Sequence, residues 1–301
     1  MDYHVPVLLK ESIDLLDVKP GGVYVDVTYG GGGHSREIIN RLGGEGSLYG
    51  FDQDEDARAN ALESSLFHFV PHNFRELKRM LRFEGVKAVD GILADLGVSS
   101  HQLDEGERGF SYRFDARLDM RMNRGEGKTA ADILNTYDAK ELQRVLGEYG
   151  EVRNSKTLAE AIVESRYNKR FTIVSDLLKV CTEQTIGDRM RYLSQVFQAL
   201  RIEANDEMGA LKDFLNQTLE VLKPGGSLVV ISYHSLEDRL VKHFLKSGRF
   251  DGEMERDFYG NINRPFQLTL KKAVEASAEE VRRNGRSRSA KLRAGKLMAK
   301  S

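Results

Sequence analysis

The chain has 301 residues and a formal net charge of −1, with 40% hydrophobic and 30% charged residues. These values are typical of a soluble globular protein with one large domain or two smaller ones. No apolar run approaches the roughly 20 residues of a transmembrane helix, and residues 1–6 lack the basic and apolar regions of a signal peptide. The single cysteine, Cys181, excludes an internal disulfide framework and a thiolate zinc cluster. We therefore expect a cytoplasmic protein without a membrane segment or a metal site.

The first pattern along the chain is a short strand followed by a glycine turn. Residues 23–27 are β-branched or aromatic except for Asp26 and predict a buried strand. Residues 30–33 are all glycine, and a run without Cβ atoms suits a sharp turn that a ligand can approach closely. A helical pattern follows, and residues 47–51 predict a second strand that ends at Asp52. This order is typical of the first half of a nucleotide-binding α/β fold, in which the acid binds a ribose diol.

Two cofactors compete for this turn. In a dinucleotide site, spaced glycines lead to a helix N-terminus that binds pyrophosphate. Here Asp26 lies in the strand four residues before Gly30, where its carboxylate would repel pyrophosphate but suits the ammonium and sulfonium of S-adenosylmethionine. The spacing therefore favours S-adenosylmethionine. The alternative is a tight structural turn in which Asp26 caps a nearby helix, and Asp52, 22 residues after Gly30, argues against it.

The rest of the chain completes a sheet of alternating strands and helices. The expected later elements are strands at 88–97, 227–234 and 266–270 and helices at 207–222 and 236–245. The strand at 88–97 carries Asp95 near its end, and the one at 266–270 is expected to be the last. This order predicts an α/β fold with a doubly wound, mostly parallel Rossmann-like sheet.

More than one hundred residues separate Asp95 from Glu207, which is too many for one connection in a compact sheet. Helical periodicity recurs in that interval at 129–135, 139–147, 155–165, 174–184 and 191–204. We expect an inserted helical domain at 105–204 that interrupts a sheet domain formed by 1–104 and 205–301. Because an open α/β sheet binds ligands at the carboxyl ends of its strands, the insert is expected to shape substrate access. A passive stabilising insert is the alternative.

The C-terminal segment is strongly basic. Residues 282–301 contain eight basic residues and no acidic one, so the rest of the chain, with 37 basic and 46 acidic residues, carries −9. Such a segment is expected to follow the phosphate backbone of a nucleic acid. A solubilising or disordered terminus is the alternative.

Eight segments carry a resemblance to one known family. They include Gly30-Gly31-Gly32-Gly33-His34-Ser35 and Ser232-Tyr233-His234-Ser235, and the full set is 4–9, 30–35, 95–104, 107–111, 119–122, 198–203, 232–239 and 287–293. Together they resemble the bacterial 16S ribosomal RNA (cytosine-N4)-methyltransferases, also called the MraW family. The resemblance implies a methyltransferase sheet with an inserted helical domain and S-adenosylmethionine as cofactor. It also implies 16S ribosomal RNA within the small ribosomal subunit as partner, without a membrane or DNA.

The resemblance further implies where the cofactor binds. The family's contacts fall on Gly32, Gly33 and His34 in the turn, Asp52 for the ribose, Phe74 for adenine, and Asp95 and Gln102 after the fourth strand. On their own, Phe74 would be read as a core residue and Gln102 as a loop amide.

The chain departs from the family or from related enzymes at three places. Asn284-Gly285 stands where the family usually has Asn-Pro, and Tyr233 stands where phenylalanine is common. Many amino-group methyltransferases carry an Asp/Asn-Pro-Pro-aromatic turn after the fourth strand, whereas residues 95–98 of this chain lack it. The catalytic residues therefore stay unassigned.

The expected chemistry is methyl transfer to an amine that is a poor nucleophile, so the enzyme mainly has to position an unstacked base. Asp95, or a backbone carbonyl at 96–98, is expected to accept a proton of that amine. His234 is a candidate for binding the base, with a structural histidine as the alternative, and Cys181 is expected in a core. Two other functions stay open: a methyltransferase for a protein or small molecule, and a non-catalytic RNA-binding assembly factor that retains a cofactor pocket.

Overall fold

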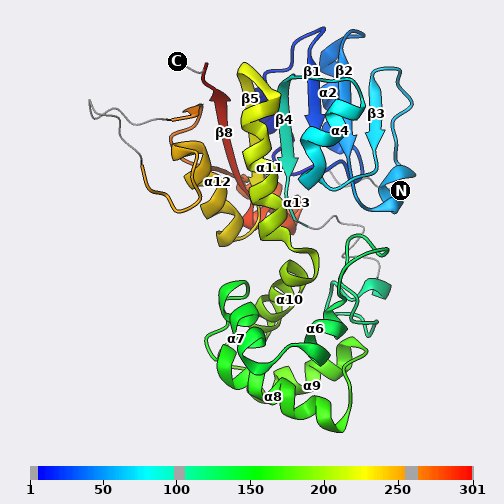
Figure 1. Ribbon diagram of the computed structural model, residues 1–301, viewed down its shortest axis with the longest axis vertical. Coiled ribbons are helices and arrows are strands. Elements are labelled where there is room, and N and C mark those ends of the chain that lie inside the picture. The colour runs from blue at the N-terminus through cyan, green and yellow to red at the C-terminus, as the bar shows by residue number, and fades with distance from the viewer. Residues whose placement is uncertain (1–5, 98–105, 255–263, 300–301) are drawn as a thin grey trace. The chain divides into compact units, whose positions relative to one another are not determined.

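The computed structural model describes residues 6–97, 106–254 and 264–299, and it divides into two compact units. Met1–Gly97 and Gly209–Ser301 form the first unit, and Val98–Met208 form the second (Figure 1). No helix within the described residues is long and apolar enough to cross a membrane.

A sheet forms the centre of the first unit (Figure 1). Its described strands are β1 (Val23–Asp26), β2 (Ser47–Phe51), β3 (Phe67–Val70), β4 (Val89–Asp95), β5 (Leu222–Ser232), β6 (Phe266–Leu268), β7 (Val274–Glu275) and β8 (Lys291–Leu297). They lie in the order β3-β2-β1-β4-β5-β8-β6, with β7 paired to β8. The pairs among β1 to β5 are parallel and the pairs that involve β8 are antiparallel. This topology confirms the predicted doubly wound, mostly parallel α/β fold.

Both faces of the sheet are covered because successive side chains of a strand point to opposite sides. In β1, Tyr24 belongs to one buried apolar cluster and Val25 to the other, and in β5 Val229 and Val230 divide in the same way. One cluster takes in α1 (Leu9–Leu16) and α2 (Gly33–Leu42). The other takes in α4 (Leu77–Phe83), α11 (Glu207–Val221) and α12 (Ser235–Ser247). The short elements α3 (Glu55–Arg58), η1 (Phe74–Glu76), α13 (Ala278–Arg283) and η3 (Gly285–Ser289) lie in the connections.

The basic C-terminal segment contains a strand of this sheet, so the alternative of a disordered terminus is wrong for residues 291–297, while contact of the segment with a nucleic acid stays a prediction. β8 pairs with β5 over six residue pairs (Figure 1). Leu292 is 0% and Ala294 is 2% exposed, and both belong to the cluster that includes α1 and α2. The expectation that the strand at 266–270 is the last is wrong for the same reason.

Some charges of the segment are also used inside the fold. Arg293 donates two hydrogen bonds to Asp238, of 2.7 and 3.0 Å, and the Lys296 ammonium lies 3.1 Å from the Asp17 carboxylate. From Lys291 to Ala294, half-buried and buried residues alternate with the period of a strand. A count of charges does not register that period, which explains why the strand was missed.

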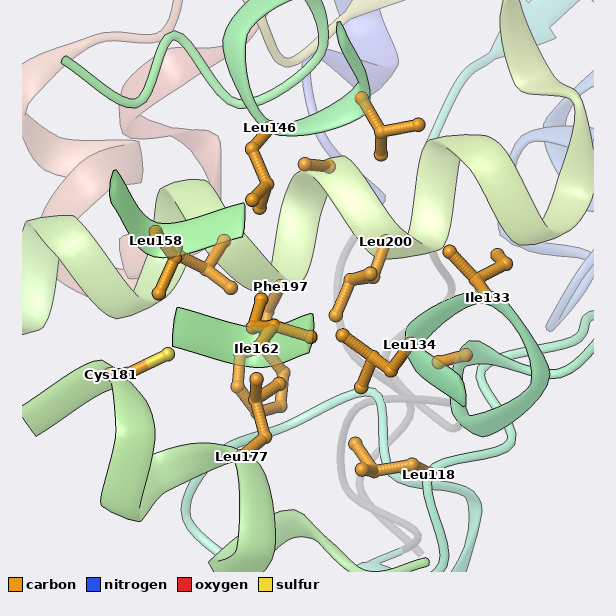
Figure 2. Packing of buried hydrophobic residues seen from close by; sticks show 14 of the residues in the cluster. Leu118, Ile133, Leu134, Leu146, Leu158, Ile162, Leu177, Cys181, Phe197 and Leu200 are labelled. Carbon is orange, nitrogen blue, oxygen red and sulfur yellow. The ribbon is translucent and has the colours of Figure 1, made fainter. Parts of the chain in front are cut away.

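The second unit is helical, and the helices expected in this interval are present. They are α6 (Ala130–Thr136), α7 (Ala139–Glu148), α8 (Ser155–Asn168), α9 (Val174–Gln184) and α10 (Arg189–Asn205), after the short η2 (Gly106–Arg108). Capping boxes begin α6 and α7, so their starts are encoded locally. Leu134, Ile162, Leu177 and Leu200, from four of the helices, are all 0% exposed and belong to one core (Figure 2). The unit therefore has a hydrophobic core of its own.

Candidate cofactor site

Three acidic residues gather at the carboxyl ends of the central strands. Ligands of an open α/β sheet bind where the strand order reverses, outside those ends. In this sheet the reversal lies between β1 and β4, since β2 and β3 continue from β1 while β5 continues from β4. Asp26 ends β1, Asp52 follows β2 and Asp95 ends β4. The candidate site therefore has an acidic rim at the position where the fold expects a ligand.

Asp52 is half-buried and held by the backbone of two turns. Its Oδ2 accepts from the amide of Gly30 at 2.8 Å and its Oδ1 accepts from the amide of Asp54 at 2.9 Å. Burial raises the pKa of the Asp52 carboxyl to about 6. Each carboxylate oxygen has a second lone pair, which suits it to accept from the two hydroxyls of a ribose.

The glycine turn has the left-handed backbone that its composition suggests. Gly30 has φ 51° and Gly32 has φ 71°, a region in which other residues are strained. A Cβ at Gly32 would lie 2.6 Å from the hydroxyl of Tyr29, and one at Gly33 would lie 2.2 Å from the Cγ of Pro6. Part of the need for glycine therefore comes from packing inside the chain.

His34 and Asp95 face each other across the site. The His34 ring is buried, with Nε2 3.1 Å from the carbonyl of Val7 and Nδ1 3.8 Å from Oδ2 of Asp95. A carbonyl only accepts, so Nε2 carries a proton and Nδ1 is the atom turned toward the carboxylate. The amide of Asp95 donates to the Thr28 hydroxyl at 2.6 Å, and the Tyr233 hydroxyl donates to Oδ1 of Asp95 at 2.7 Å.

The electrostatics of Asp95 follow from these contacts. Burial raises the pKa of its carboxyl to about 6, while His34 and the hydrogen bond from Tyr233 act in the opposite direction. The negative charge of Asp26 raises it further. The carboxyl is half-buried, and the pKa that results lies above the ordinary value for an aspartate.

Asp26 is the acid that the sequence links to a cationic ligand, but the structure gives it partners within the chain. It is 1% exposed, its Oδ2 accepts from the Ser35 hydroxyl at 2.7 Å, and its Oδ1 accepts from the Thr28 amide at 3.1 Å. Burial raises its pKa. These contacts tie β1 to the start of α2 and favour the structural alternative for this residue.

Phe74 begins η1 after β3, and its half-buried ring contacts Phe214 of α11 edge-on at a centroid distance of 5.5 Å. One side of the Phe74 ring therefore packs in the core, and the residue lies in the loop where the adenine was expected. Asn73 fixes this loop by donating to Gln53 beside Asp52 at 2.8 Å. Gln102 lies outside the described residues.

Two other residues singled out in the sequence have structural roles. His234 caps α12, where its Nε2 lies 3.1 Å from Oε1 of Glu237, which favours the structural alternative. Cys181 is 0% exposed in the helical core, as expected, and burial raises the pKa of its thiol to about 12. Sequence reasoning missed the contact of Tyr233 with Asp95. The sequence did contain a signal for this contact, because Tyr233 stands where phenylalanine is common in the resembled family.

The donor set fits S-adenosylmethionine better than a dinucleotide. The carboxylate of Asp95 at the end of β4 disfavours pyrophosphate and favours a cationic ligand, and Asp52 is available to a ribose diol. Among the described residues, a Cβ at the left-handed Gly30 would meet only the carbonyl of Thr28, at 3.9 Å, which leaves room for close approach.

Comparisons with known proteins agree with this reading. The model of the MraW methylase family matches residues 1–298. A protein named ribosomal RNA small subunit methyltransferase H from Parabacteroides distasonis is 57% identical over 97% of this chain and 96% of its own length. A protein of the same name from Flavobacterium johnsoniae is 56% identical over 97% of each chain. Among solved structures, an rRNA methylase from Streptococcus thermophilus is 10% identical over 99% of this chain and 100% of its own, with a TM-score of 0.41.

The family model covers the sheet unit and the helical insert together, and the predicted cofactor is confirmed with it. The chain belongs to the MraW methylase family and is a methyltransferase whose cofactor is S-adenosylmethionine.

Proposed function

We propose that this protein transfers the methyl group of S-adenosylmethionine to the N4 amine of a specific cytidine in 16S ribosomal RNA of the small ribosomal subunit. The observation that carries the proposal is the match over nearly the whole chain to relatives named ribosomal RNA small subunit methyltransferase H. The choice of the cytidine N4 atom rests on the family resemblance of the motifs. Action on ribosomal RNA also implies that the protein works in the cytoplasm.

We propose that the cofactor lies along the acidic edge of the sheet. Its contacts are Gly32, Gly33 and His34 at the turn, Asp52 at the ribose, Phe74 at the adenine, and Asp95 and Gln102 after β4. The proposal is supported by the backbone-held carboxylate of Asp52, whose acceptor sites suit a diol, and by the convergence of His34 and Asp95. Phe74 offers adenine only the part of its ring that Phe214 does not cover.

In the proposed mechanism the bound cofactor supplies a sulfonium methyl group, and the protein positions and deprotonates the acceptor amine. The cytosine amine is a weak nucleophile because its lone pair is delocalised into the ring. The Asp95 carboxylate accepts a hydrogen bond from one N–H of the amine, and this contact draws the lone pair out of conjugation. The same carboxylate receives the proton that leaves the amine after transfer. Its pKa of about 6 suits both roles at neutral pH.

We also propose that the inserted domain at 105–204 recognises the RNA substrate. Within the described part of the helical unit, Phe114 is 45% and Tyr167 is 81% exposed. Exposed aromatic faces stack on unpaired bases of irregular RNA, which is where sequence-specific RNA recognition concentrates. A base in such RNA is already unstacked or is flipped into the site.

The test uses small subunits from cells that lack the enzyme. Purified protein is incubated with these subunits and methyl-labelled cofactor, and the RNA is digested to nucleosides for mass spectrometry. Label in N4-methylcytidine is expected, and Asp95→Asn should abolish most of it. Label in a ring carbon, a ribose or only in protein would refute the assignment. Binding of subunits without any transfer would favour the non-catalytic assembly factor.

A further inference from the structure

Tyr233 reaches the acid that the proposed mechanism uses. It follows directly after β5, which pairs in parallel with β4 so that Asp95 lies opposite Ile231. The Tyr233 hydroxyl donates to Oδ1 of Asp95 at 2.7 Å. A Cβ at Gly97 would lie 3.4 Å from the Tyr233 ring, so the ring packs beside a residue without a side chain. The strand pairing and this packing set the direction of the hydroxyl.

The other groups around Asp95 give its carboxylate no short hydrogen bond among the described residues. Thr28 accepts from its backbone amide, and His34 faces Oδ2 at 3.8 Å, beyond the length of a good hydrogen bond. Asp26 and Glu237 are acids close enough to disfavour its ionised form. Among the described side chains, Tyr233 is therefore the one that donates a short hydrogen bond to the Asp95 carboxylate.

Tyr233 stays a donor over the whole working range of pH. Burial raises its pKa, and the neighbouring charges of Asp95, Glu237 and Glu280 raise it further. Its backbone amide is also held, because it donates to Oε2 of Glu237 at 2.9 Å. A phenylalanine would occupy nearly the same volume, so the hydroxyl adds little but this one hydrogen bond.

We propose that Tyr233 is a positioning residue of the methyl-transfer site, whose hydroxyl orients the Asp95 carboxylate and favours its ionised form. The inference rests on the proposed function in so far as Asp95 receives the amine proton. Removing the hydroxyl takes one charge-assisted hydrogen bond from the carboxylate and leaves its acidic neighbours in place. The pKa of Asp95 should then rise above its value of about 6.

The consequence is a change of the pH profile rather than a uniform loss. Losing a hydrogen bond to the charged form corresponds to a rise of the carboxyl pKa by about one to two units. With a shift of about one unit, kcat of Tyr233→Phe should fall about fivefold at pH 6 and hardly at all at pH 8.5. At pH 8.5, where Asp95 is ionised in both proteins, KM for the cofactor should change little, because the hydroxyl itself is not proposed to contact it.

The experiment compares Tyr233→Phe with the wild type and with Tyr24→Phe. Tyr24 is a matched control, since its buried ring also carries a hydrogen-bonded hydroxyl, 2.9 Å from the amide of Lys19, at the opposite end of the strands. Methyl transfer to undermethylated subunits is measured from pH 5.5 to 9, together with calorimetric affinity for S-adenosylhomocysteine. An acidic limb displaced upward only in Tyr233→Phe supports the proposal. A superimposable profile, or an equal loss at every pH, overturns it.

A second measurement does not depend on turnover. The carboxyl carbons of aspartate are labelled with ¹³C, and the Asp95 resonance is identified by its absence from Asp95→Asn. Its titration midpoint should be about one unit higher in Tyr233→Phe than in the wild type. Equal midpoints overturn the inference even if the enzyme is active. If the wild type transfers no methyl group while the midpoints differ, the proposed function fails and the role of the hydroxyl toward Asp95 stands.

Discussion

Removing the C-terminal strand is expected to unfold the sheet unit rather than only to lower its charge. Deleting residues 290–301 removes β8 and its six residue pairs with β5. At about one hydrogen bond per pair, each worth about 0.5–1.5 kcal/mol net, the ladder contributes roughly 3–9 kcal/mol. Burial of Leu292, which is 0% exposed, adds about 2–3 kcal/mol. The sum is comparable with the about 5–15 kcal/mol that separates a typical folded protein from its unfolded state.

A point variant tests the same reasoning without removing a charge. Leu292→Ala should lower the free energy of unfolding by about 2–5 kcal/mol, because a cavity forms under the strand. Met298→Ala is the control, since Met298 is 50% exposed and should cost less than about 0.5 kcal/mol.

Urea unfolding followed by circular dichroism measures both variants and the deletion, and calorimetry with S-adenosylhomocysteine reports whether the site is intact. A deletion protein with the wild-type unfolding midpoint and cofactor affinity would refute the reasoning. It would mean that β8 contributes nothing to the sheet.

Three further outcomes are expected. Asp52→Ala should weaken cofactor affinity about 10- to 100-fold through the loss of charge-assisted hydrogen bonds, and unchanged affinity in calorimetry would place the ribose elsewhere. Cofactor affinity of the wild type should fall as pH drops through about 6, because protonating Asp52 removes an acceptor; a flat profile from pH 5 to 8 would contradict this. Replacing the exposed Arg282, Arg283 and Arg288 with glutamine keeps β8 and should leave unfolding unchanged. If these side chains contact RNA, the slope of the logarithm of the RNA-binding constant against the logarithm of salt concentration should become shallower by about 2–3. An identical slope would exclude contacts between these side chains and RNA.

Local patterns in the sequence were sufficient for most elements. The strand at 47–51, the five helices of the insert and the glycine turn at 30–33 depend on periodicity, on caps such as Thr129 and on the backbone freedom of glycine. All of these act within a few residues along the chain, so they can be read without a fold. The same holds for the α/β class, since alternating strands and helices admit few topologies.

The environment of a side chain was decided only by the tertiary structure. Asp26 lies four residues before Gly30, a spacing typical of a ligand contact. In the structure α2 packs on β1, and Asp26 accepts hydrogen bonds from Thr28 and Ser35 instead. β8 has a basic composition that resembles a free terminus, yet Leu292, Ala294 and Gly295 are buried in the sheet, where β8 pairs with β5.

Tyr233 and Asp95 are 138 residues apart in the chain, and their contact depends on two strands, β4 and β5, that are adjacent in the sheet. The sequence determines which residues carry charge and hydroxyl groups and which segments form strands. Hydrogen bonds, burial and shifted pKa values arise between groups brought together from distant positions, and that proximity exists only after the sheet has formed.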